Sequence, residues 1–154
     1  MTSTPKEFPM RLFRPATPGQ LDLGLALPRI VLGVIFAAHG GQKLFVYGFA
    51  GVTEGFGQMG VPFPGLVGPA IGLLEFFGGI ALVLGFLTRV VGLGLAADMV
   101  GAIVLVHAKA GFFLPGVEFV LALGGGAGAL ALAGAGRYSL DHAIAARQAG
   151  SGAS

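Results

Sequence analysis

The chain has 154 residues, the length of one domain, and its composition is strongly apolar, with 10% charged and 55% hydrophobic residues. A soluble domain carries about a quarter charged residues, so this charged fraction is low for a soluble protein. Together with a mean hydropathy of +0.86 and 29 glycines, it indicates several membrane-spanning helices. The net charge of +2 comes without a basic stripe, which excludes nucleic acid as a partner. The absence of cysteine excludes thiol chemistry, iron–sulfur clusters, thiolate metal sites and covalent c-type haem, and no metal site is expected.

The chain divides into a polar start, four apolar segments and a polar end. Residues 1–20 lack the apolar core of a cleaved signal peptide, so we expect a retained cytoplasmic tail. A membrane-spanning helix needs about twenty apolar residues. We therefore expect an all-α, polytopic membrane protein whose domain at residues 21–137 is a four-helix bundle, with spans at 22–47, 66–88, 90–110 and 112–136. Residues 138–154 are expected to form a cytoplasmic tail that frays at its end.

A short amphipathic segment separates the first two spans. Apolar residues recur at helical spacing between Phe49 and Gly60, while Thr53, Glu54 and Gln58 occupy the other face. This pattern predicts a short helix in the outer membrane interface. Such a helix suits either a lid that only covers the bundle or a gate for a substrate.

Basic residues predict the orientation of the chain. If the amino terminus is cytoplasmic, the inner side receives six of the basic residues, namely Lys6, Arg11, Arg14, Arg89, Arg137 and Arg147, and the outer side only Lys43 and Lys109. The positive-inside rule thus favours both termini in the cytoplasm of a bacterium, with the bundle in its plasma membrane.

Glycines recur at close-packing intervals in two of the spans. Gly68 and Gly72, and likewise Gly124 and Gly128, have the GxxxG spacing that lets helix backbones approach each other in lipid. Ordinary packing within the bundle explains each pair.

Ionisable residues interrupt every span. Each costs at least about 2.5 kcal/mol on insertion scales, so each is expected to face a partner or water. They are Arg29, His39 and Lys43 in the first span, Glu75 in the second, Asp98 and His107 in the third, and Glu118 in the fourth. Because every span contributes one, a polar interior is expected in the bundle.

Depth and helical phase divide these residues into two groups. Arg29 and Asp98 lie at comparable depths in the inner half, where opposite charges favour a structural ion pair. Nine residues separate Asp98 from His107, so a straight helix points them about 180° apart. The remaining group, in the outer half, then contains His39 and Lys43 on one helix face.

The outer group is the candidate functional site. His39, Lys43 and Glu75 combine an imidazole, a cation and a carboxylate, the components of a proton-handling site. His107 and Glu118 extend this group. A non-functional role also fits both residues: His107 stands beside Lys109 at an interface, where it would be solvated, and Glu118 can pair with the same lysine.

Short motifs along the chain resemble those of a known family. They are Arg29 with Gly33, His39-Gly40-Gly41-Gln42-Lys43, Gly60-Val61-Pro62, Glu75-Phe76-Phe77-Gly78-Gly79, Leu84-Gly85, Thr88-Arg89, His107-Ala108-Lys109-Ala110-Gly111-Phe112-Phe113, Glu118 and Ser139-Leu140-Asp141. In this order and spacing the chain resembles the DoxX family of small four-span integral membrane proteins, over residues 21–144. The resemblance implies respiratory or redox chemistry in the membrane, since some relatives are subunits of thiosulfate:quinone oxidoreductase or of a terminal quinol oxidase. Others join oxidative-stress complexes with soluble partners.

These residues support three functional hypotheses. The first is a quinone-interacting subunit of a membrane oxidoreductase, in which His39 or Lys43 binds the quinone carbonyl oxygens and Glu75 exchanges protons. Electrons would then come from other membrane or soluble redox subunits, so any activity belongs to a complex. The second is a non-catalytic accessory or assembly subunit of a larger membrane complex. The third is b-type haem held by His39 and His107, whose depths in the bundle are unequal.

Overall fold

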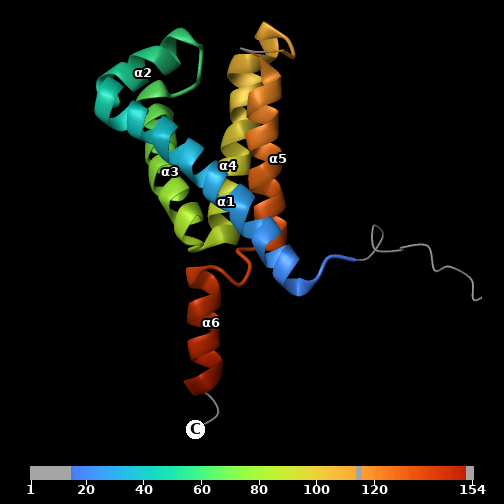
Figure 1. The fold of residues 1–154 in the computed structure, drawn as a ribbon. Coiled ribbons are helices and arrows are strands. Elements are labelled where there is room, and N and C mark those ends of the chain that lie inside the picture. The colour runs from blue at the N-terminus through green and yellow to red at the C-terminus, as the bar shows by residue number, and fades with distance from the viewer. Residues whose placement is uncertain (1–14, 114–115, 152–154) are drawn as a thin grey trace, which may run out of the picture.

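A computed structural model describes residues 15–113 and 116–151, and within these ranges every regular element is helical (Figure 1). The elements are α1 (Pro18–Gly41), the π-helix η2 (Gln42–Tyr47), α2 (Gly48–Gln58), α3 (Pro64–Leu84), α4 (Thr88–Ala102), the π-helix η3 (Ile103–His107), the 3₁₀ turn η4 (Ala108–Ala110), α5 (Val117–Ala133) and α6 (Leu140–Ser151). The expected all-α membrane bundle is therefore confirmed. The expected start of the amino-terminal tail and the fraying of residues 152–154 lie outside the described residues.

Three helical stretches are long and apolar enough to cross a membrane. They are Pro18–Gln58, Pro64–Leu84 and Thr88–Ala110. The fourth expected span, 112–136, contains the shorter apolar helix Val117–Ala133, whose 17 residues are at the lower limit for a spanning helix. The count of four spans consequently stays a prediction.

The first helix begins inside the segment expected to be a tail, at Pro18. Thr17 is its N-cap, and the Gln20 side chain accepts a hydrogen bond from the Thr17 backbone at 2.8 Å. The Thr17 hydroxyl accepts in return from the Gln20 backbone at 3.4 Å. This reciprocal capping box, together with proline at the first helical position, satisfies backbone donors that the helix start leaves unpaired.

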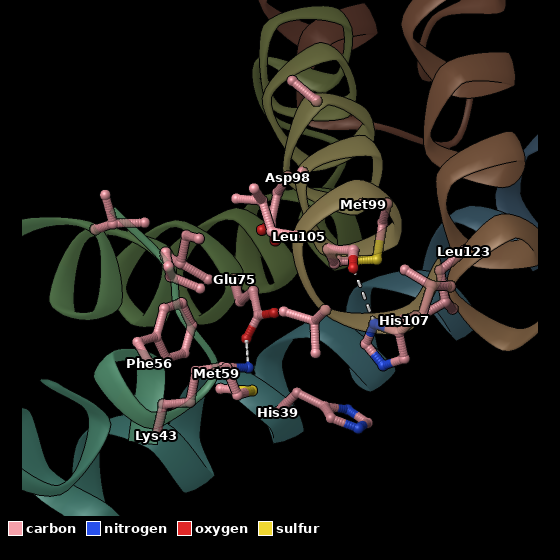
Figure 2. Close-up of a pocket in the computed structure, with 18 of the residues that line it drawn as sticks. His39, Lys43, Phe56, Met59, Glu75, Asp98, Met99, Leu105, His107 and Leu123 are labelled. Atoms are coloured by element: carbon pink, nitrogen blue, oxygen red, sulfur yellow. Dashed lines mark hydrogen bonds and ion pairs between the residues drawn. The ribbon is translucent and has the colours of Figure 1, made fainter. Parts of the chain in front are cut away.

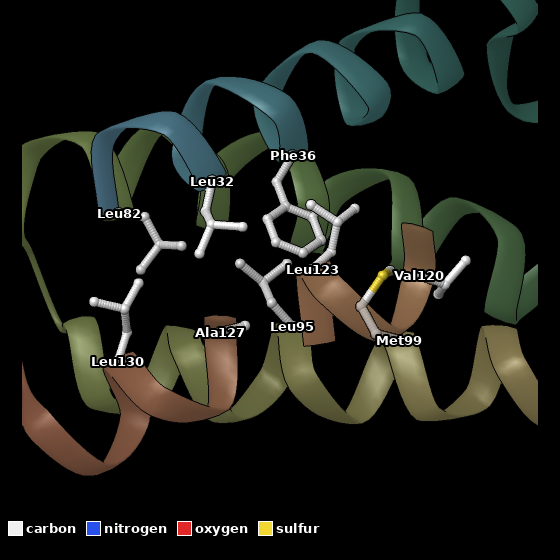
Figure 3. Packing of buried hydrophobic residues seen from close by; sticks show 9 residues of the cluster. All are labelled: Leu32, Phe36, Leu82, Leu95, Met99, Val120, Leu123, Ala127 and Leu130. Atoms are coloured by element: carbon white, nitrogen blue, oxygen red, sulfur yellow. The ribbon is translucent and has the colours of Figure 1, made fainter. Parts of the chain in front are cut away.

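The helices form two closely packed pairs, α1 with α3 and α4 with α5 (Figure 1). A core of apolar side chains joins the pairs (Figure 3), and it consists of Leu32, Phe36, Leu82, Leu95, Met99, Val120, Leu123, Ala127 and Leu130. The outward faces are also apolar: Leu132, for example, is 81% exposed. A surface of this kind suits hydrocarbon and would be costly in water.

Glycines set the distance between α1 and α3. A Cβ atom added to Gly33 would lie 2.7 Å from the Gly79 carbonyl oxygen and 2.8 Å from the Val83 nitrogen. Of the glycines expected to pack helices, Gly124 contacts the Met99 side chain, whereas a Cβ on Gly128 would meet no atom within 4 Å. The tightest packing therefore comes from glycines outside the two GxxxG pairs.

The short helix expected between the first two spans is present as α2. The chain bends at Gly48, whose φ of +66° is accessible to glycine without strain, and α2 then packs on α3. Val52 is buried at this contact, where a Cβ on Gly68 would lie 2.9 Å from its side chain. The position of α2 at a membrane interface stays a prediction.

We call the end of the bundle that carries the α3–α4 turn and α6 the tail end. Arg29 is at the centre of the contacts there. Its guanidinium is 1% exposed and donates hydrogen bonds to the carbonyl oxygens of Leu82, Val83 and Tyr138, at 2.5, 2.9 and 2.6 Å. The first two acceptors belong to the last turn of α3, and the Leu82 oxygen also accepts from the backbone nitrogen of the C-cap residue Gly85.

The expected ion pair between Arg29 and Asp98 is therefore wrong. The helix α1 crosses the bundle obliquely, and Arg29 lies level with the last turn of α3 (Figure 1). Asp98 lies ten residues beyond the start of α4, about 15 Å along its axis. The predicted depths of Arg29 and Asp98 were counted from the expected ends of the spans. That count assumes helices perpendicular to the membrane, and for that reason it gave the two residues the same depth.

Asp141 completes the network at the tail end. Its carboxylate accepts hydrogen bonds from the backbone nitrogens of Leu87 at 2.8 Å and Thr88 at 2.9 Å, and so caps the start of α4. Leu87 has a φ of +49°, a strained conformation for leucine that these bonds stabilise. Asp141 belongs to α6, a helix in the segment expected to be a cytoplasmic tail, and α6 extends away from the bundle (Figure 1).

The orientation of the chain can be tested because the sequence has no cysteine. Glu54 in α2 and Ala149 in α6 are both exposed and lie at opposite ends of the structure (Figure 1). With cytoplasmic termini, a membrane-impermeant maleimide added to intact cells should label Glu54→Cys and spare Ala149→Cys until the cells are lysed. The reverse labelling pattern would mean an inverted chain.

The glycine contact predicts an asymmetric response to one added methyl group. Gly33→Ala should destabilise the bundle by about 1–3 kcal/mol, because the methyl group meets the α3 backbone. Gly24→Ala, in the same helix, meets no atom within 4 Å and should be neutral or mildly stabilising. Thermal unfolding of the two variants in the same detergent compares them, and equal stability would contradict a close α1–α3 contact at Gly33.

Candidate functional site

A cavity of about 410 Å³ lies between the two helix pairs, on the α2 side of the core (Figure 2). Its lining is mostly apolar and comes from α1 to α5, with Phe36, Phe56, Met59, Val61, Val67, Ile71, Ala97, Met99, Gly101, Ala102, Leu105, Val106, Phe119, Val120 and Leu123. Five ionisable residues also line it: His39, Lys43, Glu75, Asp98 and His107. The structure thus brings together most of the expected outer group and adds Asp98.

Glu75 and Lys43 form an ion pair across the α1–α3 interface, with the ammonium donating to Oε2 of the carboxylate (Figure 2). The side chain of Glu75 is 6% exposed and that of Lys43 is 19% exposed. Glycine permits this approach: a Cβ on Gly72, one turn before Glu75, would lie 3.3 Å from the Lys43 Cβ. The pair neutralises two charges that would each be costly inside an apolar bundle.

In both histidines the ring nitrogen Nδ1 contacts a backbone carbonyl oxygen earlier in the chain. Nδ1 of His39 lies 2.9 Å from the Ile35 carbonyl oxygen, and Nδ1 of His107 lies 3.0 Å from the Ala102 carbonyl oxygen. Because a carbonyl oxygen only accepts, Nδ1 carries the proton in both rings. In the neutral form of such a ring Nε2 is the nitrogen without a proton and can accept a hydrogen bond. The exposed ring of His39 also lies against Phe119 of α5, with centroids 6.2 Å apart.

Both π-helices contribute to the cavity. η2 carries Lys43, and η3 ends at His107, whose ring bonds a carbonyl five residues earlier. A π-turn places one more residue in each turn than an α-helix, so it rotates the later residues of the helix about the axis. The prediction that Asp98 and His107 point in opposite directions is therefore wrong, because it assumed an uninterrupted α-helix.

Asp98 is the residue that the sequence-based grouping misplaced. It lies within electrostatic reach of Glu75 and Lys43. Its Oδ2 atom is buried and makes no hydrogen bond to any residue that the structure describes. The sequence did contain the signal, an acidic residue in the middle of an apolar span, but opposite charge assigned it to Arg29.

The remaining candidates differ in their fit. Glu118 lies in the first turn of α5 and is not among the residues that line the cavity. Haem ligation by His39 and His107 stays a prediction, and both residues line the cavity. Phe56 of α2 and Met59, which follows it, line the cavity, and a role of α2 as a lid or a gate stays a prediction.

Comparison with known proteins adds relatives. Residues 24–108 match the model of the DoxX family. Inner membrane protein YqjF of Escherichia coli (strain K12) is 35% identical over 128 residues, which cover 80% of this chain and 93% of that protein. CatD of Bacillus subtilis (strain 168), whose name assigns it provisionally to the oxidoreductases, is 35% identical over 91 residues, 59% of this chain and 65% of CatD. An uncharacterized membrane protein of Mycobacterium tuberculosis is 34% identical over 138 residues, which cover 81% of this chain and 83% of that protein. No solved structure matches the chain.

The ion pair predicts strong coupling between its members. Lys43→Met leaves a buried carboxylate without a partner, and Glu75→Leu leaves an ammonium without one, so each should destabilise the bundle by about 3 kcal/mol. The double variant Lys43→Met/Glu75→Leu removes both charges and should lose much less than the sum.

Unfolding in mixed detergent and dodecyl sulfate micelles measures this cycle. Glu54→Gln serves as the control, because Glu54 is exposed on α2 and its bond to Gln58 is solvent-facing; its effect should stay within about 0.5 kcal/mol. Additive losses in the double variant would show that the two side chains do not interact in the membrane protein.

Proposed function

Because the chain belongs to the DoxX family, we propose that it is a quinone-interacting subunit of a membrane oxidoreductase. The observation that carries this proposal is the apolar cavity, with an ion pair and a second carboxyl group on its wall. In a bundle whose outer surface is apolar, a ligand that reaches such a cavity from the bilayer must itself be lipophilic.

The cavity suits a quinone ring in size and chemistry. Its volume of about 410 Å³ falls in the range of small-molecule sites, and its apolar lining includes three phenylalanines, Phe36, Phe56 and Phe119. A quinone ring packs against such side chains and needs polar groups only at its carbonyl oxygens. Lys43 keeps N–H groups beyond the one it donates to Glu75, so it can donate to one carbonyl oxygen.

Protons and electrons would take separate routes. Reduction of a quinone to a quinol takes two electrons and two protons, and a proton arriving at a quinone oxygen requires a nearby acid. Glu75 and the histidines are the titratable groups at hand. The electrons would come from a partner, a membrane or soluble redox subunit, and the provisional oxidoreductase name of CatD supports such a setting. Residence in a bacterial plasma membrane with both termini in the cytoplasm belongs to the same proposal, and inner membrane protein YqjF supports it.

Gentle purification tests the proposal. The protein in mild detergent should release ubiquinone or menaquinone on lipid extraction, and a short-chain quinone should bind it saturably in a titration monitored by equilibrium dialysis. Glu75→Gln should weaken quinone binding by about tenfold, since Lys43 loses the charged partner that positions it. Glu54→Gln, outside the cavity, should bind as the wild type does.

The opposite result favours an accessory or assembly subunit. If neither extraction nor titration detects quinone, the quinone proposal fails. If His39 and Glu75 can be replaced together by apolar residues without loss of function of the assembled complex, the cavity serves only the fold. A Soret band in the purified protein would instead revive haem ligation by His39 and His107.

A further inference from the structure

The Asp98 side chain is a carboxyl group that the ion pair does not use. It faces the same cavity as Glu75, and its Oδ2 atom is buried without a hydrogen bond to any described residue. Arg29, the cation expected to neutralise it, is occupied by three backbone carbonyl oxygens at the tail end. A buried acceptor left unpaired in the native fold calls for an explanation.

The charges around Asp98 do not balance. The titratable residues that line the cavity are His39 from α1, Lys43 from η2, Glu75 from α3 and His107 from η3, while α2 and α5 contribute uncharged residues. Lys43 contributes +1, and Glu75 and Asp98 contribute −1 each, so with neutral imidazoles the sum is −1. Lys43 is already paired with Glu75, so an ionised Asp98 would be a second carboxylate in apolar surroundings without a cation of its own, which is unfavourable. Binding one proton removes that cost.

A bound quinone requires two hydrogen-bond donors from the cavity, one for each of its carbonyl oxygens. Its two carbonyl oxygens lie on opposite sides of the ring, and both are acceptors. Lys43 supplies a donor for one of them. In the neutral form of His39 and His107, Nε2 is an acceptor and not a donor, because Nδ1 of each donates to a backbone carbonyl oxygen. A protonated Asp98 is the side chain that supplies the second donor.

We propose that Asp98 holds a proton in the ligand-free protein and donates this O–H to a quinone carbonyl oxygen, opposite Lys43. The inference rests on the proposed function, since it names the second donor of the same site. Asp98 thereby becomes a ligand-binding residue rather than half of a structural ion pair. After reduction the quinol hydroxyls are donors, and the Nε2 atoms of His39 and His107 are the acceptors that suit them.

Infrared spectroscopy tests the proton without any quinone. The ligand-free protein in lipid nanodiscs at neutral pH should show the carbonyl stretch of a protonated carboxylic acid. Asp98→Asn should remove this band, while Glu54→Gln, an exposed residue outside the cavity, should keep it. Absence of the band in the wild type, or its persistence in Asp98→Asn, overturns the proposal whatever quinone does.

Quinone binding by the same proteins tests the donor. Asp98→Asn keeps an N–H donor of similar shape and should bind a short-chain quinone within a few-fold of the wild type, whereas Asp98→Leu should lose about tenfold in affinity. Asp98→Leu removes an unpaired buried polar group, so its fold is expected to survive, and size-exclusion chromatography checks this. Wild-type affinity in a well-folded Asp98→Leu overturns the role of Asp98 as donor. A wild type that shows the infrared band but binds no quinone overturns the proposed function itself, and with it the quinone role of Asp98.

Discussion

A charged side chain inside this bundle must find its partner within the protein, because the surrounding hydrocarbon supplies neither hydrogen bonds nor counter-ions. The chain meets this constraint in two ways. At the tail end, Nη1 and Nη2 of Arg29 donate to the backbone carbonyl oxygens of Leu82, Val83 and Tyr138. On the α2 side of the core, Lys43 is neutralised by Glu75. The first solution joins three chain segments into one fold, and the second places a polar pair on the wall of an apolar cavity.

Much of this arrangement could be predicted from the sequence, because composition and residue spacing determine it. The apolar stretches predict the membrane bundle, and four-residue spacing on one helix brings His39 and Lys43 to one cavity. The pairing of Lys43 with Glu75 was also within reach, since both lie at membrane depth and carry opposite charge. The partners of Arg29 were not, because backbone carbonyl oxygens carry no sequence signal. A charge-matching argument therefore selected Asp98 for Arg29.

Two local departures from the α-helix explain why part of the site could not be predicted. The π-turns at η2 and η3 shift the helical phase, and no residue type marks them. With η3 in place, His107 lines the same cavity as Asp98, although an uninterrupted helix would separate them. The α6 helix was also missed, since its composition is polar and small and its stability depends on contacts of Asp141 with the α3–α4 turn.

The close backbone contact at Gly33 and Gly79 has a mechanical consequence. It holds α1 and α3 together as one closely packed pair. The helices α4 and α5 form the second pair, and the apolar core lies between the two pairs. The cavity lies between the two pairs, on the α2 side of this core (Figure 2). Since Lys43 stands on one pair and Asp98 and His107 continue from the other, a change in the angle between the pairs would change the distance across the cavity.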